Sequence, residues 1–171
     1  KYLNKYKLDG GNIYIPPGWD NWQALPGQNQ FDYTLYDNDT VRRFGNAAQD
    51  YQTDVVARLA QDFIRNGDPR PFFLTLTPTV PHYEGEDDDG GRTIQPAPRH
   101  ADTPAIVPIP PESAKAYNEA NMKDKPAWMR ELPIADTALL RAGYNSKVAA
   151  MRAFDDLVGR VEHFVWDWDR P

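Results

Sequence analysis

The chain contains no cysteine among its 171 residues. This absence excludes disulfide bonds, thiolate metal ligands and a cysteine nucleophile within the chain. No apolar run approaches the about 18 residues that would indicate a membrane-spanning helix. Clusters of lysine and arginine are also missing and the formal net charge is −6, so the sequence lacks the cationic surface that nucleic-acid binding requires. No charged segment followed by an apolar one opens the chain, so we expect no signal peptide in it.

Proline and glycine, in contrast, are frequent, with 16 and 11 residues, which predicts much loop. Hydrophobic residues make up 40% and charged residues 26% of the chain, as in a soluble globular protein. A chain of this length forms one domain and can bury roughly 70% of its unfolded surface. Because the chain begins with Lys1 and ends with Pro171, we expect a mature product or a fragment of something larger.

Apolar residues at helical spacing predict two helices. The first covers 53–66, with Thr53 or Asp54 capping its first turn. The second is one long helix over 137–166 with Asp136 as its cap, and its large apolar residues step by three or four throughout. In the mixed segment before it, we expect Trp128 and Met129 to act as apolar anchors.

Residues 71–77 are the best candidate for a strand. The run Phe72-Phe73-Leu74 is apolar at consecutive positions, as in a strand covered on both faces by helices. A helix that leads into such a strand favours an α/β fold. Shorter alternations predict strands at 12–15 and 31–36, with a hairpin turn at 37–39. The proline-rich stretch 78–112 predicts a long irregular segment of the kind that is either functional or disordered.

His82 is the most informative single residue, because it follows this predicted strand closely. In open α/β sheets, ligands bind beyond the carboxyl ends of the strands. An imidazole at such a place can donate a proton or a hydrogen bond near neutral pH. The alternative interpretation is a loop histidine that packs or faces solvent.

Other chemical groups have a structural interpretation beside a functional one. The acidic run 84–89 offers oxygen ligands for Ca²⁺, but it lacks the ligand spacing of an EF-hand and favours a solvated loop. Trp19 and Trp22 could stack on a sugar ring or belong to the core. Asp155 and Asp156 are neighbours on a helix and diverge, which favours capping or ion pairs with Arg152 or Arg160 over acid–base catalysis.

Read in order, a series of segments resembles the sulfatase family, in particular the branch of N-acetylglucosamine-6-sulfatases and arylsulfatases. The resemblance extends over nearly the whole chain. Its segments are Lys1-Tyr2-Leu3-Asn4, Pro16-Pro17-Gly18-Trp19-Asp20 with Trp22, Phe31-Asp32-Tyr33-Thr34-Leu35, Tyr51-Gln52-Thr53-Asp54-Val55, Pro71-Phe72-Phe73-Leu74, Pro81-His82, Pro96-Ala97-Pro98-Arg99-His100, Asp124-Lys125-Pro126-Ala127-Trp128 and Phe154-Asp155-Asp156-Leu157-Val158-Gly159.

The resemblance implies an α/β, alkaline-phosphatase-like fold and hydrolysis of sulfate esters. Residues 1–171 would form the central part of a single catalytic domain, as a partial fold of sheet strands with flanking helices and long loops. The family's formylglycine nucleophile arises in a Cys/Ser-x-Pro-x-Arg motif, which this chain lacks. The family's Ca²⁺ ligands, an early Asp-Asp pair and a later Asp-Asn pair, are not matched either. We therefore expect the nucleophile-bearing part and the later metal-ligand part to lie outside the chain, which alone would be catalytically incomplete.

Two catalytic residues match the resemblance. Lys1 corresponds to the lysine that pairs with the sulfate oxygens, and His82 to the histidine that contacts the sulfate and assists proton transfer to the leaving group. Asn4, Trp19 and Trp22 are candidates for lining the substrate cleft. The implied partners are a sulfated sugar or aryl sulfate and the remaining segments of the polypeptide. The implied location is secreted, periplasmic or lysosomal.

Two other functions stay open at this point. Related enzymes of the same fold hydrolyse phosphate or phosphonate esters with similar anion clamps. A non-catalytic glycan-binding module would use tyrosine and tryptophan stacking and would need no convergence of Lys1 with His82.

Overall fold

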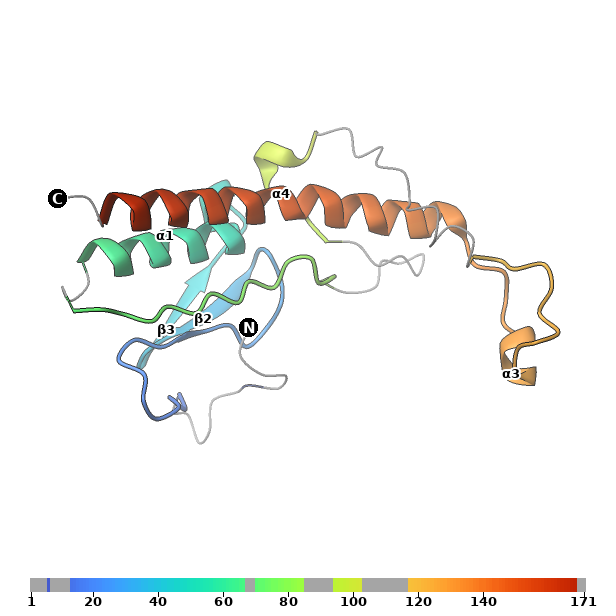
Figure 1. Ribbon diagram of the computed structural model, residues 1–171, viewed down its shortest axis with the longest axis horizontal. Coiled ribbons are helices and arrows are strands. Elements are labelled where there is room, and N and C mark those ends of the chain that lie inside the picture. Colours follow the sequence, from blue (N-terminus) through green and yellow to red (C-terminus); the bar gives the residue numbers. More distant parts are fainter. Residues whose placement is uncertain (1–5, 7–12, 67–69, 85–93, 103–116, 169–171) are drawn as a thin grey trace.

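The structure is a computed structural model that describes residue 6 and residues 13–66, 70–84, 94–102 and 117–168. Its order along the chain is β1 (Gln23–Ala24), β2 (Tyr33–Asp37), β3 (Thr40–Phe44), the 3₁₀ turn η1 (Ala48–Asp50), α1 (Gln52–Asn66), the 3₁₀ turn η2 (Pro98–His100), α3 (Ala127–Arg130) and α4 (Thr137–Trp168). Helix α1 lies between the small sheet and the long helix α4 (Figure 1).

The sheet is antiparallel, in the order β1-β2-β3. Strands β2 and β3 form a hairpin in which Asp37 lies opposite Thr40 and Tyr33 opposite Phe44. The turn needs a left-handed residue, which Asn38 supplies with a φ of 53°. The side chain of Asn38 also accepts a hydrogen bond from the Trp22 backbone at 2.8 Å, which holds the hairpin against β1. The predicted strand at 31–36 and its turn at 37–39 are confirmed.

Helix α1 covers one face of this sheet. Val55 packs with Leu25, Tyr33 and Leu35 in one apolar cluster. At its start, Tyr51 is fully buried against Ala97 and Ala153. Burial raises the pKa of the Tyr51 phenol, whose hydroxyl donates to the Gln95 carbonyl at 3.0 Å. The predicted helix is therefore confirmed, and it ties the sheet to α4.

The predicted capping of α1 by Thr53 or Asp54 is wrong. Both residues lie inside the helix and are buried. Thr53 donates its hydroxyl proton to Gln30 at 3.3 Å, and Asp54 pairs with Arg99. Because these side chains bind residues of other segments, they do not accept hydrogen bonds from the first backbone amides of α1.

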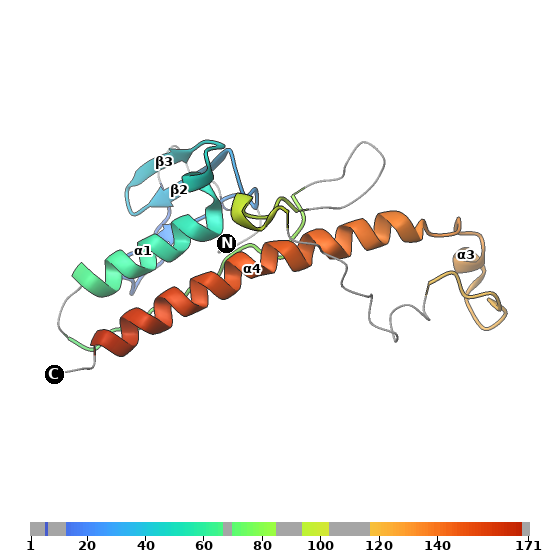
Figure 2. The same cartoon turned by 90° about the horizontal axis from the view of Figure 1, so that it is seen from above.

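Helix α4 begins as predicted, because the Asp136 carboxylate accepts hydrogen bonds from the amides of Ala138 and Leu139 at 2.8 and 3.2 Å. The helix runs alongside α1 and extends well past it (Figure 2). Its buried positions are mainly small ones, Ala149, Ala150 and Ala153, which let the two helices approach closely. The expectation that the larger apolar residues form the buried stripe is wrong: Val148 and Met151 are half-buried, and Val158 and Val165 are exposed.

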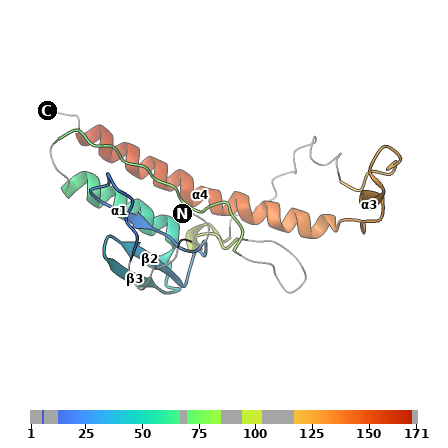
Figure 3. The ribbon, with the colours of Figure 1, turned by 90° about the horizontal axis from the view of Figure 1, so that it is seen from below.

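The predicted strand at 71–77 is wrong. This segment is extended but is assigned to no sheet, and it runs back beside α1 and α4 (Figures 1 and 3). A strand exists only when a neighbour completes its hydrogen bonds, and no other strand of the described chain lies along this segment. Residues 13–15, also predicted as part of a strand, are irregular for the same reason.

The prediction that Trp128 acts as an apolar anchor is also wrong. It lies in the short helix α3, at the far end of α4 from the sheet (Figure 1), and its side chain is 64% exposed. Met129 beside it is half-buried.

An ionic cluster joins η2 to both helices. Arg99 donates to the two carboxylate oxygens of Asp54 on α1 at 2.5 and 2.9 Å and to Asp156 on α4 at 2.6 Å. His100 also contacts Asp156 at 2.8 Å. The ion pairs expected for Asp156 within its own helix are therefore replaced by tertiary ones, and Arg160 pairs with Asp54 at 3.5 Å.

Replacing Arg99 by alanine tests this cluster. The Asp54 carboxylate would keep only the longer contact with Arg160, so Arg99→Ala is expected to lower the free energy of unfolding by about 2–3 kcal/mol. Urea titration of the isolated chain measures this loss. The matched control Arg130→Ala removes an exposed arginine on α3 and is expected to cost under about 0.5 kcal/mol. Equal effects of the two substitutions would contradict a structural role for Arg99.

The pH dependence of the stability tests the contacts of Asp156. Burial opposes the charged form, but hydrogen bonds from His100 and Arg99 win and hold the pKa of Asp156 below its usual 3.8. A carboxyl with a depressed pKa stabilises the fold above its unfolded-state pKa, and this contribution disappears as the pH falls through the folded value. The difference in unfolding free energy between the natural chain and Asp156→Asn should therefore be present above about pH 5 and shrink as the pH falls below about pH 4. A difference that grows in acid would contradict this assignment.

Candidate functional site

The candidate site is the tight turn 78–83, which follows the extended segment 71–77 and carries His82. The Thr79 carbonyl accepts a hydrogen bond from the His82 amide at 2.8 Å, closing the turn. The Val80–Pro81 peptide bond inside it is cis. The turn thus presents His82 outward from a closed backbone loop.

A buried polar network anchors this turn to the rest of the fold. Gln30 donates to the Thr79 hydroxyl at 2.8 Å, and this hydroxyl donates in turn to the side-chain carbonyl of Gln52. Gln52 also donates to the Asn29 carbonyl at 2.7 Å. The side chains of Gln30, Gln52 and Thr79 are all buried. Since buried polar groups are costly when unpaired, this network specifies the position of the turn relative to α1.

An apolar contact anchors the turn to α4. Val80 packs against Ile94 and Ala150 in one buried cluster, with Phe154 at its edge. The Ile94 amide is in turn hydrogen-bonded to Ser146 on α4 at 3.3 Å. Thr79 and Val80 therefore hold the turn from opposite sides, one by polar and one by apolar burial.

The His82 imidazole is exposed and oriented by its neighbour. Its Nδ1 lies 2.8 Å from the Tyr83 carbonyl, and the two rings are 4.9 Å apart. Because a carbonyl oxygen only accepts, Nδ1 carries the proton. The same carbonyl accepts from the Gln28 side chain at 3.0 Å. Nε2 has no hydrogen-bond partner among the described residues, so it is available to accept a proton or, once protonated, to donate one to a ligand.

A shallow hollow of ≈ 620 Å³ lies where this turn meets α4. Two cations line it, Lys147 and Arg152, together with one carboxylate, Asp155. The local balance of charge is therefore positive in a chain of net charge −6. The remaining lining residues are Pro81, Tyr144, Val148 and Met151.

Of the other predicted site residues, the structure describes Trp19 and Trp22. Lys1 and Asn4 lie outside the described residues. Trp22 is buried and donates its indole N–H to the Tyr6 hydroxyl at 3.0 Å. Trp19 is 40% exposed and lies 5.6 Å from the Trp22 ring. That either tryptophan lines a substrate cleft stays a prediction.

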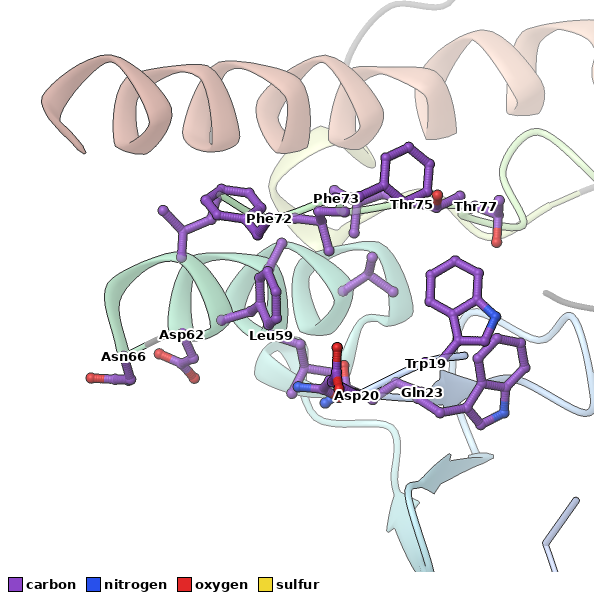
Figure 4. Close-up of a pocket in the computed structure, with 18 of the residues that line it drawn as sticks. Trp19, Asp20, Gln23, Leu59, Asp62, Asn66, Phe72, Phe73, Thr75 and Thr77 are labelled. Carbon is purple, nitrogen blue, oxygen red and sulfur yellow. The ribbon is translucent and has the colours of Figure 1, made fainter. Parts of the chain in front are cut away.

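Trp19 and Trp22 instead line a large groove of ≈ 1430 Å³, which does not include His82. Figure 4 shows Trp19 facing the extended segment near Thr77, with Leu59 of α1 on another wall. The Trp19 ring lies 6.3 Å from Phe73. Most of the other walls are apolar side chains from α1 and from the extended segment, including Val56, Phe63, Leu74 and Leu76.

The described residues do not fit a metal site or a formylglycine. No group of three or more histidine, aspartate or glutamate side chains among them could hold an ion. The acidic run considered as a Ca²⁺ site falls, apart from Glu84, outside the described residues, and Glu84 accepts a hydrogen bond from the Gln95 amide at 2.9 Å. With no cysteine and no Cys/Ser-x-Pro-x-Arg motif, the chain offers no residue from which the nucleophile could be made.

Sequence reasoning missed the residues that support His82. Gln30 and Gln52 lie far from it in the chain, and neither was a candidate site residue. Lys147 and Arg152 occupy helix positions between the apolar residues, which is typical of a solvated face.

The chain is 30% identical over 182 residues to the arylsulfatase of Volvox carteri, in an alignment that covers 94% of this chain and 28% of that protein. It is 38% identical over 87 residues to the N-acetylglucosamine-6-sulfatase of Homo sapiens, covering 48% of this chain and 16% of that enzyme. The sequence belongs to the sulfatase family.

A further relative is the extracellular sulfatase SULF-1 homologue of Drosophila melanogaster, which is 33% identical over 88 residues, 48% of this chain and 8% of that protein. The chain spans less than a third of the length of each of these sulfatases. No family model and no solved structure matches it. Within the described ranges, every helix is too short or too polar to cross a membrane.

Removal of the Thr79 hydroxyl tests the support of the turn. Thr79→Val keeps the side-chain shape but leaves Gln30 and Gln52 buried with a lost partner, so the free energy of unfolding should fall by about 1–3 kcal/mol. Urea titration measures the change, and Thr75→Val, at an exposed position, is the control. A loss no larger than that of the control would show that the network does not hold the turn.

Proposed function

We propose that residues 1–171 form the central part of the catalytic domain of a sulfuric ester hydrolase with an alkaline-phosphatase-like α/β fold. One observation carries the proposal: the sulfatase-like Pro81-His82 segment lies on a turn anchored from two sides and presents an imidazole whose Nε2 has no hydrogen-bond partner among the described residues. The small sheet flanked by helices is compatible with part of such a domain.

In this proposal, His82 serves the leaving group. Hydrolysis of a sulfate ester releases an alcohol oxygen that needs a proton as the sulfur–oxygen bond breaks. The Tyr83 carbonyl keeps the proton on Nδ1, so a protonated imidazole would donate from Nε2 to the ester oxygen or to a sulfate oxygen. The fixed turn spares the cost of orienting the ring during the reaction.

The matched lysine, Lys1, would supply a positive charge to the sulfate oxygens. A cation there stabilises both the bound anion and the charge that develops in the transition state. Asn4 and the exposed ring of Trp19 are proposed to line the cleft beside it, with Trp22 holding Trp19 in place through their ring contact.

The remaining chemistry is proposed to come from outside residues 1–171. In this family, formylglycine supplies the nucleophile and Ca²⁺ stabilises the sulfate, and neither fits the described residues. The catalytic unit would therefore be the polypeptide that combines this chain with a nucleophile-bearing and a metal-binding segment.

The proposed substrate is a sulfated carbohydrate or an aryl sulfate, in keeping with the names of the relatives, N-acetylglucosamine-6-sulfatase and arylsulfatase. The proposed location is outside the cytoplasm, because another relative is named an extracellular sulfatase.

Hydrolysis of a chromogenic aryl sulfate in the presence of Ca²⁺ tests the proposal. Residues 1–171 alone should give no saturable turnover, whereas the longer polypeptide should hydrolyse the sulfate ester in preference to the matching phosphate ester. His82→Ala in the longer polypeptide should lower kcat/KM about 10²–10⁴-fold. The control His163→Ala changes an exposed histidine on α4 and should leave the rate unchanged. Full activity of His82→Ala would overturn the role of His82, and turnover by residues 1–171 alone would overturn the claim of incompleteness.

A further inference from the structure

The hollow where the turn of His82 meets α4 is lined by two cations that the fold itself does not use. They are Lys147 and Arg152. Among the described residues, neither side chain forms an ion pair or a hydrogen bond, so the ion pair predicted for Arg152 is not formed. Arg99 and Arg160, in contrast, are both paired with carboxylates of the helices. The charges of Lys147 and Arg152 are therefore available to a ligand.

The period of the helix places the two cations on either side of one apolar stripe. Successive residues of an α-helix turn by about 100°, so Tyr144, Val148 and Met151 fall on one face of α4. Lys147 lies to one side of this face and Arg152 to the other, about 7.5 Å further along the helix axis. All five residues line the hollow, which thus has an apolar floor with a cation on each side.

The hollow adjoins the proposed reaction centre. Pro81 forms part of its wall and is bonded directly to His82, so the Cα atoms of these two residues are about 3.8 Å apart. Val80 packs against Ala150 of α4 in a buried cluster. This packing sets the distance between the His82 turn and the cations. A substrate whose sulfate ester reaches His82 would therefore place its adjoining part over the hollow.

The chemistry of the hollow suits an oxyanion that is carried on a ring. Lysine and arginine donate charge-assisted hydrogen bonds to sulfate and carboxylate oxygens. The Tyr144 ring and Met151 offer apolar surface to the body of a sugar or aryl ring. The volume of ≈ 620 Å³ lies within the about 300–1,000 Å³ of a usual small-molecule site. In a chain of net charge −6, such a local pair of cations directs an anion to this place.

We propose that Lys147 and Arg152 form a second anion subsite, which binds a sulfate or carboxylate group of the substrate other than the sulfate ester that is hydrolysed. The substrate is then a carbohydrate with at least two anionic groups. Because this subsite holds a part of the substrate that does not react, it lowers KM and leaves kcat unchanged. The inference rests on the proposed function and deepens it, since it names the substrate class for the same site.

Direct binding to the longer polypeptide with His82→Ala tests the subsite without turnover. The probes are a disaccharide with one sulfate and the same disaccharide with either a second sulfate or a carboxylate. The second anionic group should lower Kd about 10-fold at low salt, and the gain should shrink as the salt concentration rises. A gain with the second sulfate or with the carboxylate supports the subsite and identifies the group that it takes. Equal Kd values for all three probes would overturn it.

Charge substitutions in the same polypeptide assign the gain to residues. Lys147→Gln and Arg152→Gln should each reduce the gain from the second anionic group by about 3–10-fold and leave the Kd of the singly charged probe unchanged. Asp155→Asn removes the carboxylate that lines the hollow and should increase the gain. The control Arg43→Gln, at an exposed position on β3, should have no effect. A loss with Arg43→Gln as large as with the other two, or a loss with Asp155→Asn, would overturn the assignment.

Stability and kinetics separate this inference from other effects. Because neither cation has a partner in the described chain, Lys147→Gln and Arg152→Gln should leave the unfolding midpoint of residues 1–171 unchanged. In the active longer polypeptide they should raise KM for a doubly charged substrate about 3–10-fold at constant kcat. A binding preference that depends on Lys147 and Arg152 in a polypeptide that hydrolyses no sulfate ester would support the subsite and overturn the proposed function. An active polypeptide with equal KM values for singly and doubly charged substrates would do the reverse.

Discussion

The structure depends on one buried hydrogen-bond network, in which the Thr79 hydroxyl lies between the side chains of Gln30 and Gln52. Gln30 precedes the β2–β3 hairpin, Gln52 begins α1 and Thr79 begins the turn that carries His82. A hydroxyl both accepts and donates, so it can satisfy two amide side chains at once where water has no access. Without it, each part would leave a polar group unpaired in the interior.

Around this network, the fold is built on contacts across distant parts of the chain. Arg99 bridges α1 and α4 through two carboxylates, and Tyr51 fills the space between α1, η2 and α4. The small residues Ala150 and Ala153 let α4 come close. These contacts stabilise one end of the molecule, while the groove beside segment 71–77 stays open. The side chains of Leu74 and Leu76, which line this groove, are therefore only half-buried.

The candidate site follows the same division. His82 has a fixed backbone and an oriented ring, yet its surroundings are exposed, with cations from α4 nearby. A preorganised imidazole is useful for catalysis only when other groups converge on the same substrate. Lys1 and Asn4, which are proposed to act with His82, lie outside the described residues, and the chain spans less than a third of the length of the sulfatases it matches. The β2–β3 hairpin, by comparison, has its pairing partners within the described chain.

The sequence by itself determined the elements whose information is local. The Asp136 cap, the presence of the helices α1 and α4 and the turn at Asn38 all depend on neighbours within a few residues, and all appear as predicted. It also determined the family, because the motifs are identified from the order of residues along the chain and need no tertiary contact. Only the tertiary structure decided that Thr53 and Asp54 bind other segments and do not cap α1, that Trp128 is exposed, and that segment 71–77 has the composition of a strand without a strand beside it. The physical reason is that caps and periods are satisfied within one segment, whereas strand pairing and buried ion pairs need a partner whose position the local sequence does not encode.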